Sequence, residues 1–211
     1  MPQPPRRTPE VTEIVAHNRL ARSRHVLLRA ALGSVLIALP FALTGAGVPN
    51  TFLTVLPIVP GLFILLLLLL QVRHGRRLDV CERVLRTYPL EYRDRVDRRG
   101  SDRLLLGTVH TVKLPIRGQH GAPTMRALNA SMTRRWPEGA ASGAWFAGDP
   151  AFGGVMVVPD TGDMLFLQPA EWRKYETERD EADPGRRALA EQAGISALLE
   201  KEPNTIAALG G

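Results

Sequence analysis

Residues 145 to 154 hold the side chains whose types and spacing are best suited to chemistry. Glycines at 148, 153 and 154 surround Asp149, and aromatic side chains stand at 145 and 152. Exposed backbone N–H groups of such a loop can bind an anion. Glycine and proline are also what a wide β-hairpin needs, so a structural turn is the favoured interpretation and a ligand loop the alternative. The residues of this possible ligand loop are Trp145, Gly148, Asp149, Phe152 and Gly153.

A second acidic pattern, Asp160-Thr161-Gly162, spells the motif of aspartic proteases, whose paired carboxylates activate water. Pro159 stands where that motif has an apolar strand residue, and Asp163 stands where it has a small one. A hairpin turn explains the same residues. The five histidines show no metal-ligand spacing with each other or with the cysteine. We therefore predict no catalytic residue, no cofactor and no metal site.

A long apolar block precedes all of these residues. Ala30 to Val72 contains 43 residues without Asp, Glu, Lys, Arg or His, which matches two membrane crossings of about 20 residues each. Turn-forming residues from Gly45 to Asn50 break the block near its middle. We therefore predict an α+β membrane protein with a two-helix transmembrane hairpin, whose helices cover about 26–44 and 51–72.

Small side chains recur every four residues along the first of these helices. In a membrane such a stripe lets another helix backbone approach closely, and the partner would be the second helix or another copy of the chain. An alanine-rich composition can produce the same stripe by chance. The pattern predicts a possible homo-oligomer through the face formed by Ala30, Ser34, Ala38, Ala42 and Ala46.

Arginine flanks the apolar block on both sides, whereas its central turn carries no charge. Because Arg and Lys favour the cytoplasmic side of a membrane, we expect both termini in the cytoplasm. A cleaved signal peptide is the rival interpretation, but the first apolar run exceeds the usual length of roughly 7 to 15 residues. Basic side chains here would also contact anionic lipid headgroups. The candidates are Arg22, Arg24, Arg29, Arg73, Arg76 and Arg77.

Composition indicates the compartment and the class of partner. The net charge is +6, with 24 arginines against 3 lysines. This usage resembles that of high-GC bacteria, so we expect the bacterial plasma membrane. The positive charge lies beside the apolar block and not on the later, folded part, which argues against a nucleic-acid partner. Cys81 is the only cysteine, which excludes an intramolecular disulfide, and we expect it as a small apolar residue on a helix face.

The chain is predicted to divide into five parts. Residues 1–25 form a basic cytoplasmic arm, in which a helix from Glu10 either lies in the lipid interface or leads into the first crossing. The hairpin covers 26–72, and a basic juxtamembrane helix and linker cover 73–100. A β-rich cytoplasmic domain follows over 101–183, and a C-terminal helix and tail cover 184–211.

The β-rich domain has several segments with strand composition. Leu104 to Ile116 is rich in β-branched and apolar residues and predicts a strand. Short helices are expected from Thr124 and from Pro169, and the charge-mixed run from Glu91 to Arg103 is typical of a solvated face. Three short apolar runs joined by Gly, Pro and Asp turns predict an antiparallel meander, over 144–147, 155–158 and 164–167.

The segment from Trp145 to Val155, placed after an arginine-flanked apolar pair, resembles uncharacterised actinobacterial integral membrane proteins. The resemblance covers the hairpin and this segment. It implies an architecture and no activity, so no functional residue is carried over from it.

A fixed membrane position without a catalytic cluster predicts a membrane-anchored cytoplasmic binding or scaffold module, with a protein partner and the anionic bilayer as its contacts. One alternative is a small enzyme acting on a membrane-proximal substrate, with Asp149, Asp160 or Asp163 as acid or base. Another is a membrane-tethered regulator that needs the C-terminal stretch from Arg187 to Gly211, part of which resembles a helix-turn-helix.

Overall fold

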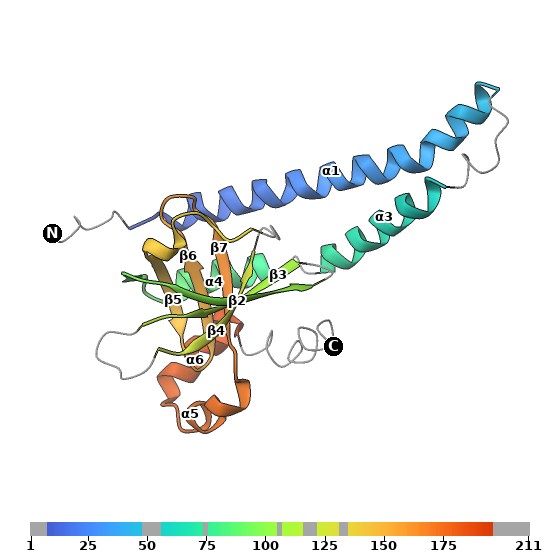
Figure 1. Cartoon of the computed structure of the whole chain (residues 1–211). Helices are drawn as coiled ribbons and strands as arrows, with labels where there is room; N and C mark the ends of the chain where they lie inside the picture. Colours follow the sequence, from blue (N-terminus) through green and yellow to red (C-terminus); the bar gives the residue numbers. More distant parts are fainter. Residues whose placement is uncertain are drawn as a thin grey trace. The chain divides into compact units, whose positions relative to one another are not determined.

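The computed structural model describes residues 8–47, 56–73, 76–104, 107–115, 122–130 and 135–195. The chain divides into a β-sheet unit, which comprises Met1–Arg19 and Arg77–Gly211, and a helical unit, which comprises Leu20–Arg76. One continuous helix, α1 (Val11–Gly45), contributes its first residues to the β-sheet unit and the remainder to the helical unit (Figure 1). The helix expected from Glu10 is therefore the lead of the long apolar helix.

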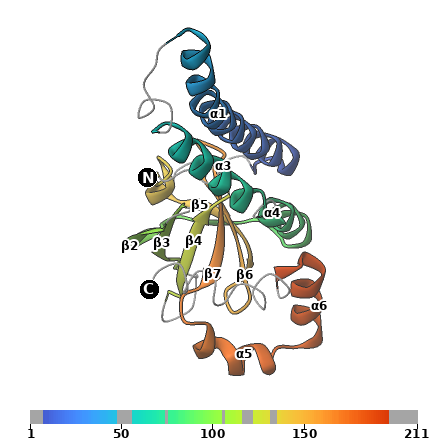
Figure 2. The same cartoon turned by 90° about the vertical axis from the view of Figure 1, so that its right-hand side faces the viewer.

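In the helical unit, α1 packs against a second helix, α3 (Ile58–Arg73), and two glycines set how closely they approach. A Cβ atom placed on Gly61 would lie 2.8 Å from Ile37 Cγ1 and 3.1 Å from the Gly33 carbonyl oxygen. A Cβ atom placed on Gly33 would lie 3.0 Å from Leu65 Cδ2. These contacts run in opposite directions along the two helices, so the pair is antiparallel, and Figures 1 and 2 both draw it side by side.

The predicted stripe of small residues on α1 does not face α3. The buried residues of α1 within the helical unit are Gly33 and Pro40, whereas Ser34, Ala38 and Ala42 are exposed. The stripe is therefore open among the described residues, and its use as a homo-oligomer contact stays a prediction.

The predicted second membrane crossing over 51–72 is not supported. Among the described helices, α1 alone is long and apolar enough to span a membrane, and 11% of its apolar window is buried. Leu56 and Pro57 form a turn, after which α3 runs for 16 residues. At ~1.5 Å per residue α3 is about 24 Å long, which is less than the ~30 Å of a hydrocarbon core. Pro57 determines where α3 begins, because the Gly61 N–H donates to its carbonyl and proline favours the beginning of a helix. Residues 51–55 of the predicted crossing lie outside the described residues.

The β-sheet unit is built on a seven-stranded, fully antiparallel sheet with the order β1-β5-β6-β7-β4-β3-β2. Its central hairpins pair Ala147 with Val155 and Val155 with Phe166, which confirms the predicted meander. The strands are β1 (Glu91–Arg93), β2 (Asp97–Leu104), β3 (Gly107–Lys113), β4 (Thr124–Asn129), β5 (Ala144–Asp149), β6 (Gly153–Val157) and β7 (Met164–Pro169).

The sheet has to curl, because its two edge strands are neighbours in the chain. β1 ends at Arg93 and β2 begins at Asp97, so their nearest ends lie within about 14 Å, the reach of four extended residues. A flat sheet with β1 and β2 at opposite edges would separate them by about 29 Å, at ~4.8 Å for each neighbouring strand. The short link over 94–96 therefore requires a curled, partly closed sheet with an inner face.

Side chains alternate between the two faces of this sheet, so each face has its own apolar core. The outer core contains Trp145, Val155 and Phe166, together with residues of α4 (Arg76–Thr87) and α6 (Pro184–Ala193). Figure 2 shows these two helices on the same side of the strands. The inner core contains Phe146 and Met125, and its buried members all come from strands, loops and one short turn. Curling of the sheet explains how this second core is buried without a covering α-helix.

Asn18 joins the beginning of α1 to the sheet. Its side chain is fully buried, and its Nδ2 donates to the Gly162 carbonyl at 2.7 Å and to the Ile14 carbonyl at 2.9 Å. Its Oδ1 accepts from the Met164 N–H at 3.1 Å. Because buried amides are stable only when their hydrogen bonds are made, this residue fixes the first turns of α1 beside β7.

Two segments differ from their sequence-based expectations. The helix expected from Thr124 is strand β4, because Met125 and Ala127 alternate into the inner core while β3 and β7 supply pairing on both sides. The charge-mixed run from Glu91 to Arg103 contains β1 and β2, most of whose charged side chains are exposed. Pairing with distant strands overrides local composition in β4, which pairs with β7, and in β1, which pairs with β5, whereas β2 pairs with the next strand in the chain, β3.

The expected helices after the meander are present in shorter form. A 3₁₀ turn covers Trp172–Tyr175 and α5 covers Glu176–Asp180. α6 begins at Pro184, where the Asp183 carboxylate accepts hydrogen bonds from the Gly185 and Arg186 N–H groups as a helix cap does.

Candidate functional site

The possible ligand loop is the tight hairpin between β5 and β6. A Cβ atom on Gly148 would lie 2.5 Å from the Gly153 carbonyl oxygen, and one on Gly153 would lie 2.7 Å from the Leu167 carbonyl oxygen. Both glycines also have positive φ angles, +138° and +113°, which side chains disfavour. The glycines are therefore explained by the close approach of β5, β6 and β7.

Asp149 is the polar centre of this hairpin, and its carboxylate is already occupied. It accepts hydrogen bonds from the Ala151 N–H at 2.9 Å, from Arg186 Nε at 2.7 Å and from the same guanidinium's NH2 at 2.9 Å. The hydrogen bond with Asp149 is the main cause that raises the pKa of Arg186 above its ordinary value. The two-point contact holds α6 against the hairpin.

The aromatic side chains of the same segment also have structural partners. Phe152 belongs to the outer core, and Trp145 packs edge-on against Tyr92 with ring centroids 5.3 Å apart. Trp145 Nε1 is buried without a hydrogen-bond partner among the described residues. These contacts give the loop a structural role, while ligand binding by it stays a prediction.

The three acidic residues proposed as acid or base do not form one cluster. Asp149 is the last residue of β5, at the turn before β6, whereas Asp160 and Asp163 lie in the turn after β6, at the opposite end of that strand. The second turn is closed by a hydrogen bond from the Val158 N–H to the Asp163 carbonyl at 3.0 Å. A paired-carboxylate mechanism therefore has no support in this arrangement.

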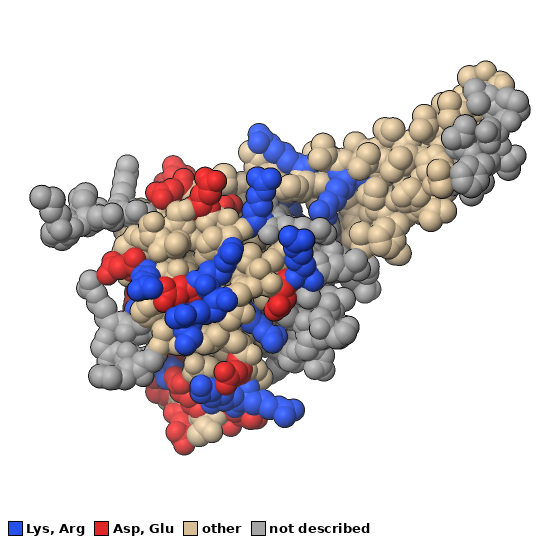
Figure 3. Space-filling view, viewed as in Figure 1, with Lys and Arg blue, Asp and Glu red and all other residues tan. Residues whose placement is uncertain are grey.

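Five of the six arginines proposed as lipid contacts lie in the helical unit, and the sixth, Arg77, is the first residue of the β-sheet unit after it. Arg22, Arg24 and Arg29 are on α1, Arg73 ends α3, and Arg76 begins α4 next to Arg77. Figure 3 shows the far end of α1 and α3 without any charged atoms among the described residues. The contact of these arginines with lipid stays a prediction.

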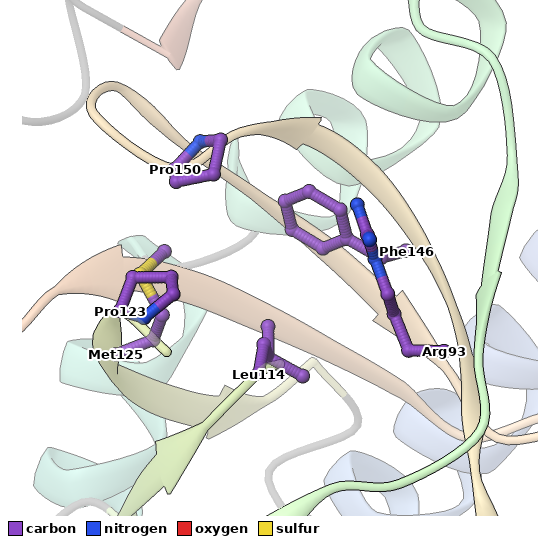
Figure 4. A pocket seen from close by; sticks show the side chains of 6 residues that line it. All are labelled: Arg93, Leu114, Pro123, Met125, Phe146 and Pro150. Atoms are coloured by element: carbon purple, nitrogen blue, oxygen red, sulfur yellow. The ribbon is translucent and has the colours of Figure 1, made fainter. Parts of the chain in front are cut away.

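A small pocket opens at one end of the inner core. It has room for about one water molecule, and three of its lining side chains, Leu114, Met125 and Phe146, belong to the inner core. Pro123 and Pro150 complete the apolar wall, and Arg93 is the one charged residue that lines it (Figure 4).

Arg93 reaches this pocket from strand β1. Its side chain is 12% exposed, its NH2 contacts the exposed Glu91 carboxylate at 2.5 Å, and its guanidinium carbon lies 5.9 Å from the centre of the Phe146 ring. Its Nε is buried and has no partner among the described residues. Sequence reasoning missed Arg93 because the charge-mixed run around it is typical of solvent-facing segments. The alternation of Glu91, Tyr92 and Arg93 was the one local signal for a strand at this position.

His110 lies on the same inner face, on strand β3. It is buried, its ring is 5.0 Å from that of Trp136 in an edge-on arrangement, and neither ring nitrogen has a hydrogen-bond partner in the described part of the chain. Burial, and secondarily the Arg98 charge, lower the pKa of His110. The imidazole is therefore held neutral in the folded chain.

Cys81 is inert in this arrangement. The thiol is fully buried on α4 within the outer core, and desolvation raises its pKa to about 12. Because the thiolate is the reactive form, Cys81 is not a nucleophile in the folded chain. Its place on a buried helix face agrees with its expected structural role.

Replacing Asp149 tests the structural role of the hairpin. Asp149→Asn removes the charge that holds Arg186 and should lower the free energy of unfolding by about 1–3 kcal/mol, less than a fully buried pair because Arg186 is partly exposed. Glu171→Gln is the matched control: its partner Lys174 is 3.8 Å away and both side chains are exposed, so its effect should stay below about 0.5 kcal/mol. Chemical denaturation of the full chain measures both; equal stability of Asp149→Asn and the parent would leave Asp149 available for a ligand.

The buried His110 should make the folded protein less stable in acid. Because its folded pKa is lowered, the unfolded chain binds the proton more readily, and the stability present above the ordinary pKa of 6.5 falls as the pH drops below that value. His110→Gln should flatten this part of the stability profile. Thermal unfolding from pH 8 to pH 5 measures the difference, and parallel profiles for the variant and the parent would contradict the assignment.

Comparisons with known proteins supply no relative for this site. No family model, curated protein or solved structure matches the chain. Within the described ranges, no three His, Cys, Asp or Glu side chains are grouped as a metal ion would require. The function therefore has to be argued from the geometry.

Proposed function

We propose that this protein is a membrane-anchored binding module, whose helical unit inserts in the lipid bilayer and whose β-sheet unit binds a ligand or partner beside it. The observation that carries the proposal is the exposed apolar surface of the helical unit. Among the described residues from Leu27 to Leu69, twelve large apolar side chains are more than 40% exposed. Half-exposed side chains of this size each cost on the order of 1 kcal/mol in water, so together they cost about as much as a typical domain gains by folding.

Charge supports the same location. The described residues of α1 after Arg29, and those of α3 before Arg73, include no ionisable side chain. The six arginines at the two ends of these segments would lie at the headgroups, where each contributes about 1 kcal/mol toward an anionic surface. A bacterial plasma membrane offers such lipids, and the arginine bias favours the cytoplasmic side for both termini.

The arrangement in the bilayer follows from the antiparallel pair. From Val26 to Gly45, α1 is about 30 Å long, enough to cross the hydrocarbon core. α3 returns along it and is about 6 Å short of a full crossing, a mismatch that tilt or local thinning of the bilayer accommodates at modest cost. We propose that the chain enters and leaves on the same side, as a two-helix hairpin.

Two further contacts belong to this proposal. The open stripe of Ser34, Ala38 and Ala42 offers a surface for a second copy of the chain in the membrane. A protein partner in the cytoplasm would bind the β-sheet unit. The enzyme and regulator alternatives have no specific support, because the acidic residues lie at opposite ends of β6 and residues 196–211 lie outside the described ranges.

Two exposed leucines allow a matched test of insertion. Leu39 on α1 is 43% exposed and Leu189 on α6 is 36% exposed, so in water their cysteine variants should react alike. In native membranes a water-soluble maleimide should label Leu189→Cys at least tenfold faster than Leu39→Cys, because lipid covers position 39. The buried Cys81 supplies the unreactive background.

The same variants report the orientation. If both termini are cytoplasmic, Leu189→Cys should react in broken cells and not in intact ones. Equal labelling of the two positions in membranes, or release of the parent chain from the membrane fraction by alkaline carbonate, would contradict insertion. Labelling of Leu189→Cys in intact cells would contradict the cytoplasmic side alone.

A further inference from the structure

His110 is a buried imidazole whose two ring nitrogens have no hydrogen-bond partner among the described residues. It is 2% exposed and lies on the inner face of the sheet, opposite Ser101 of β2 and Ala127 of β4 in the strand register. A neutral imidazole in this position leaves its hydrogen bonds unmade, whereas an imidazolium would also bury a charge. The packing around His110 therefore favours the neutral ring.

The charged groups around His110 also disfavour a proton on it. On β2, Arg98 is the charged residue that acts on the imidazole. β4 presents an alanine opposite the ring. The loop before the 3₁₀ turn Ala140–Ser142 presents Trp136, and Glu138, the acidic residue of this loop, is exposed. No carboxylate in the described part of the chain acts on the His110 pKa, so an imidazolium would have no counter-ion there.

Trp136 is the neighbour of His110 that can move at least cost. Its ring centre lies 5.0 Å from that of His110, and the guanidinium carbon of Arg98 lies 5.8 Å from the same ring. Trp136 is half-buried and lies outside the strands and helices, whereas β3 is hydrogen-bonded to a strand on each side. Segments with few backbone pairings open before a paired core does. Pro137 and Ala140 are buried, so only the beginning of the loop has to turn outward.

We propose that His110 and Trp136 form an acid-sensitive switch on the inner core. When the imidazole takes up a proton, Trp136 turns out to solvent, water reaches both ring nitrogens, and the sheet stays folded. Trp136 packs against the inner core, so its departure opens that core at one place. The pKa of His110 is lowered from 6.5, and the opening is therefore expected below pH 6.5. This switch goes beyond the binding role proposed above and does not depend on the membrane anchor.

The test follows the tryptophans separately by ¹⁹F NMR, in the full chain labelled with 5-fluorotryptophan and held in lipid nanodiscs. Trp136→Phe identifies the Trp136 signal, and the signal of Trp145, which is buried in the outer core, reports whether the sheet is folded. Between pH 8 and pH 5 the Trp136 signal should move toward that of fluorotryptophan in water. Its broadening by a water-soluble gadolinium chelate should rise at least threefold, while the Trp145 signal should not change.

Two variants assign the transition to the imidazole. His110→Phe keeps an aromatic ring beside Trp136 that cannot titrate, so the Trp136 signal should stay at its pH 8 position throughout. Glu138→Gln is the matched control, because Glu138 is the exposed acidic group on the same loop as Trp136. Its transition should have the same midpoint as that of the parent.

A readout without substitution guards against loss of folding in the variants. With ¹³C-labelled histidine in the parent chain, the His110 ring should titrate with the same midpoint as the Trp136 signal. Different midpoints for these two signals would contradict a switch made of the two residues.

Four further results would overturn the proposal. The first is a Trp136 signal that does not change down to pH 5. The second is joint movement of the Trp136 and Trp145 signals, because His110 would then lower the stability of the whole sheet without a local opening. The others are a transition that persists in His110→Phe and one that vanishes in Glu138→Gln.

Discussion

The exposed apolar surface of α1 and α3 is the constraint on which the account depends. The two helices pack on each other through Gly33 and Gly61, yet this contact covers one narrow side of each. Twelve described leucine, valine and phenylalanine side chains of this unit point outward. Exposing that surface to water would cost about as much free energy as a typical domain gains by folding. Burial of this surface in lipid would remove the cost, and the proposed location rests on this argument.

A second constraint shapes the β-sheet unit. The three residues between β1 and β2 bring the edges of a seven-stranded sheet within reach of each other. The resulting curl buries an inner core that no α-helix covers. It also brings Arg93 beside Phe146 at the small pocket at one end of that core. The pocket is thus a consequence of topology, because its lining residues are spread from position 93 to position 150.

Several features follow from local sequence alone. The apolar block and its arginine flanks are visible as composition, and the β5–β6–β7 meander is marked by glycine, proline and aspartate turns. The start of α6 is readable from Asp183 and Pro184, a cap followed by the residue that best begins a helix. In these segments local preference and tertiary structure agree.

Other features depend on partners that lie far away in the sequence. β1 is a strand because the distant β5 pairs with it, although Glu91 to Arg93 has a polar, charged composition. β4 is a strand because it lies between β3 and β7. The local sequence does not distinguish Arg93 and His110 from other polar residues. Only the curl of the sheet places them on the inner face. Asp149 shows the converse, since a conspicuous acidic residue in a glycine-rich loop is occupied by Arg186.

The most direct test of the account is the depth of α1 in lipid. Nitroxide labels at Leu28, Val35 and Phe41, all outward-facing positions, can be compared for collision with oxygen, which concentrates in the bilayer, and with a water-soluble nickel complex. The account predicts that the ratio of oxygen to nickel collisions is highest at Val35, and that nickel reaches Leu28 far more readily. Equal nickel access at all three positions in reconstituted membranes would contradict it.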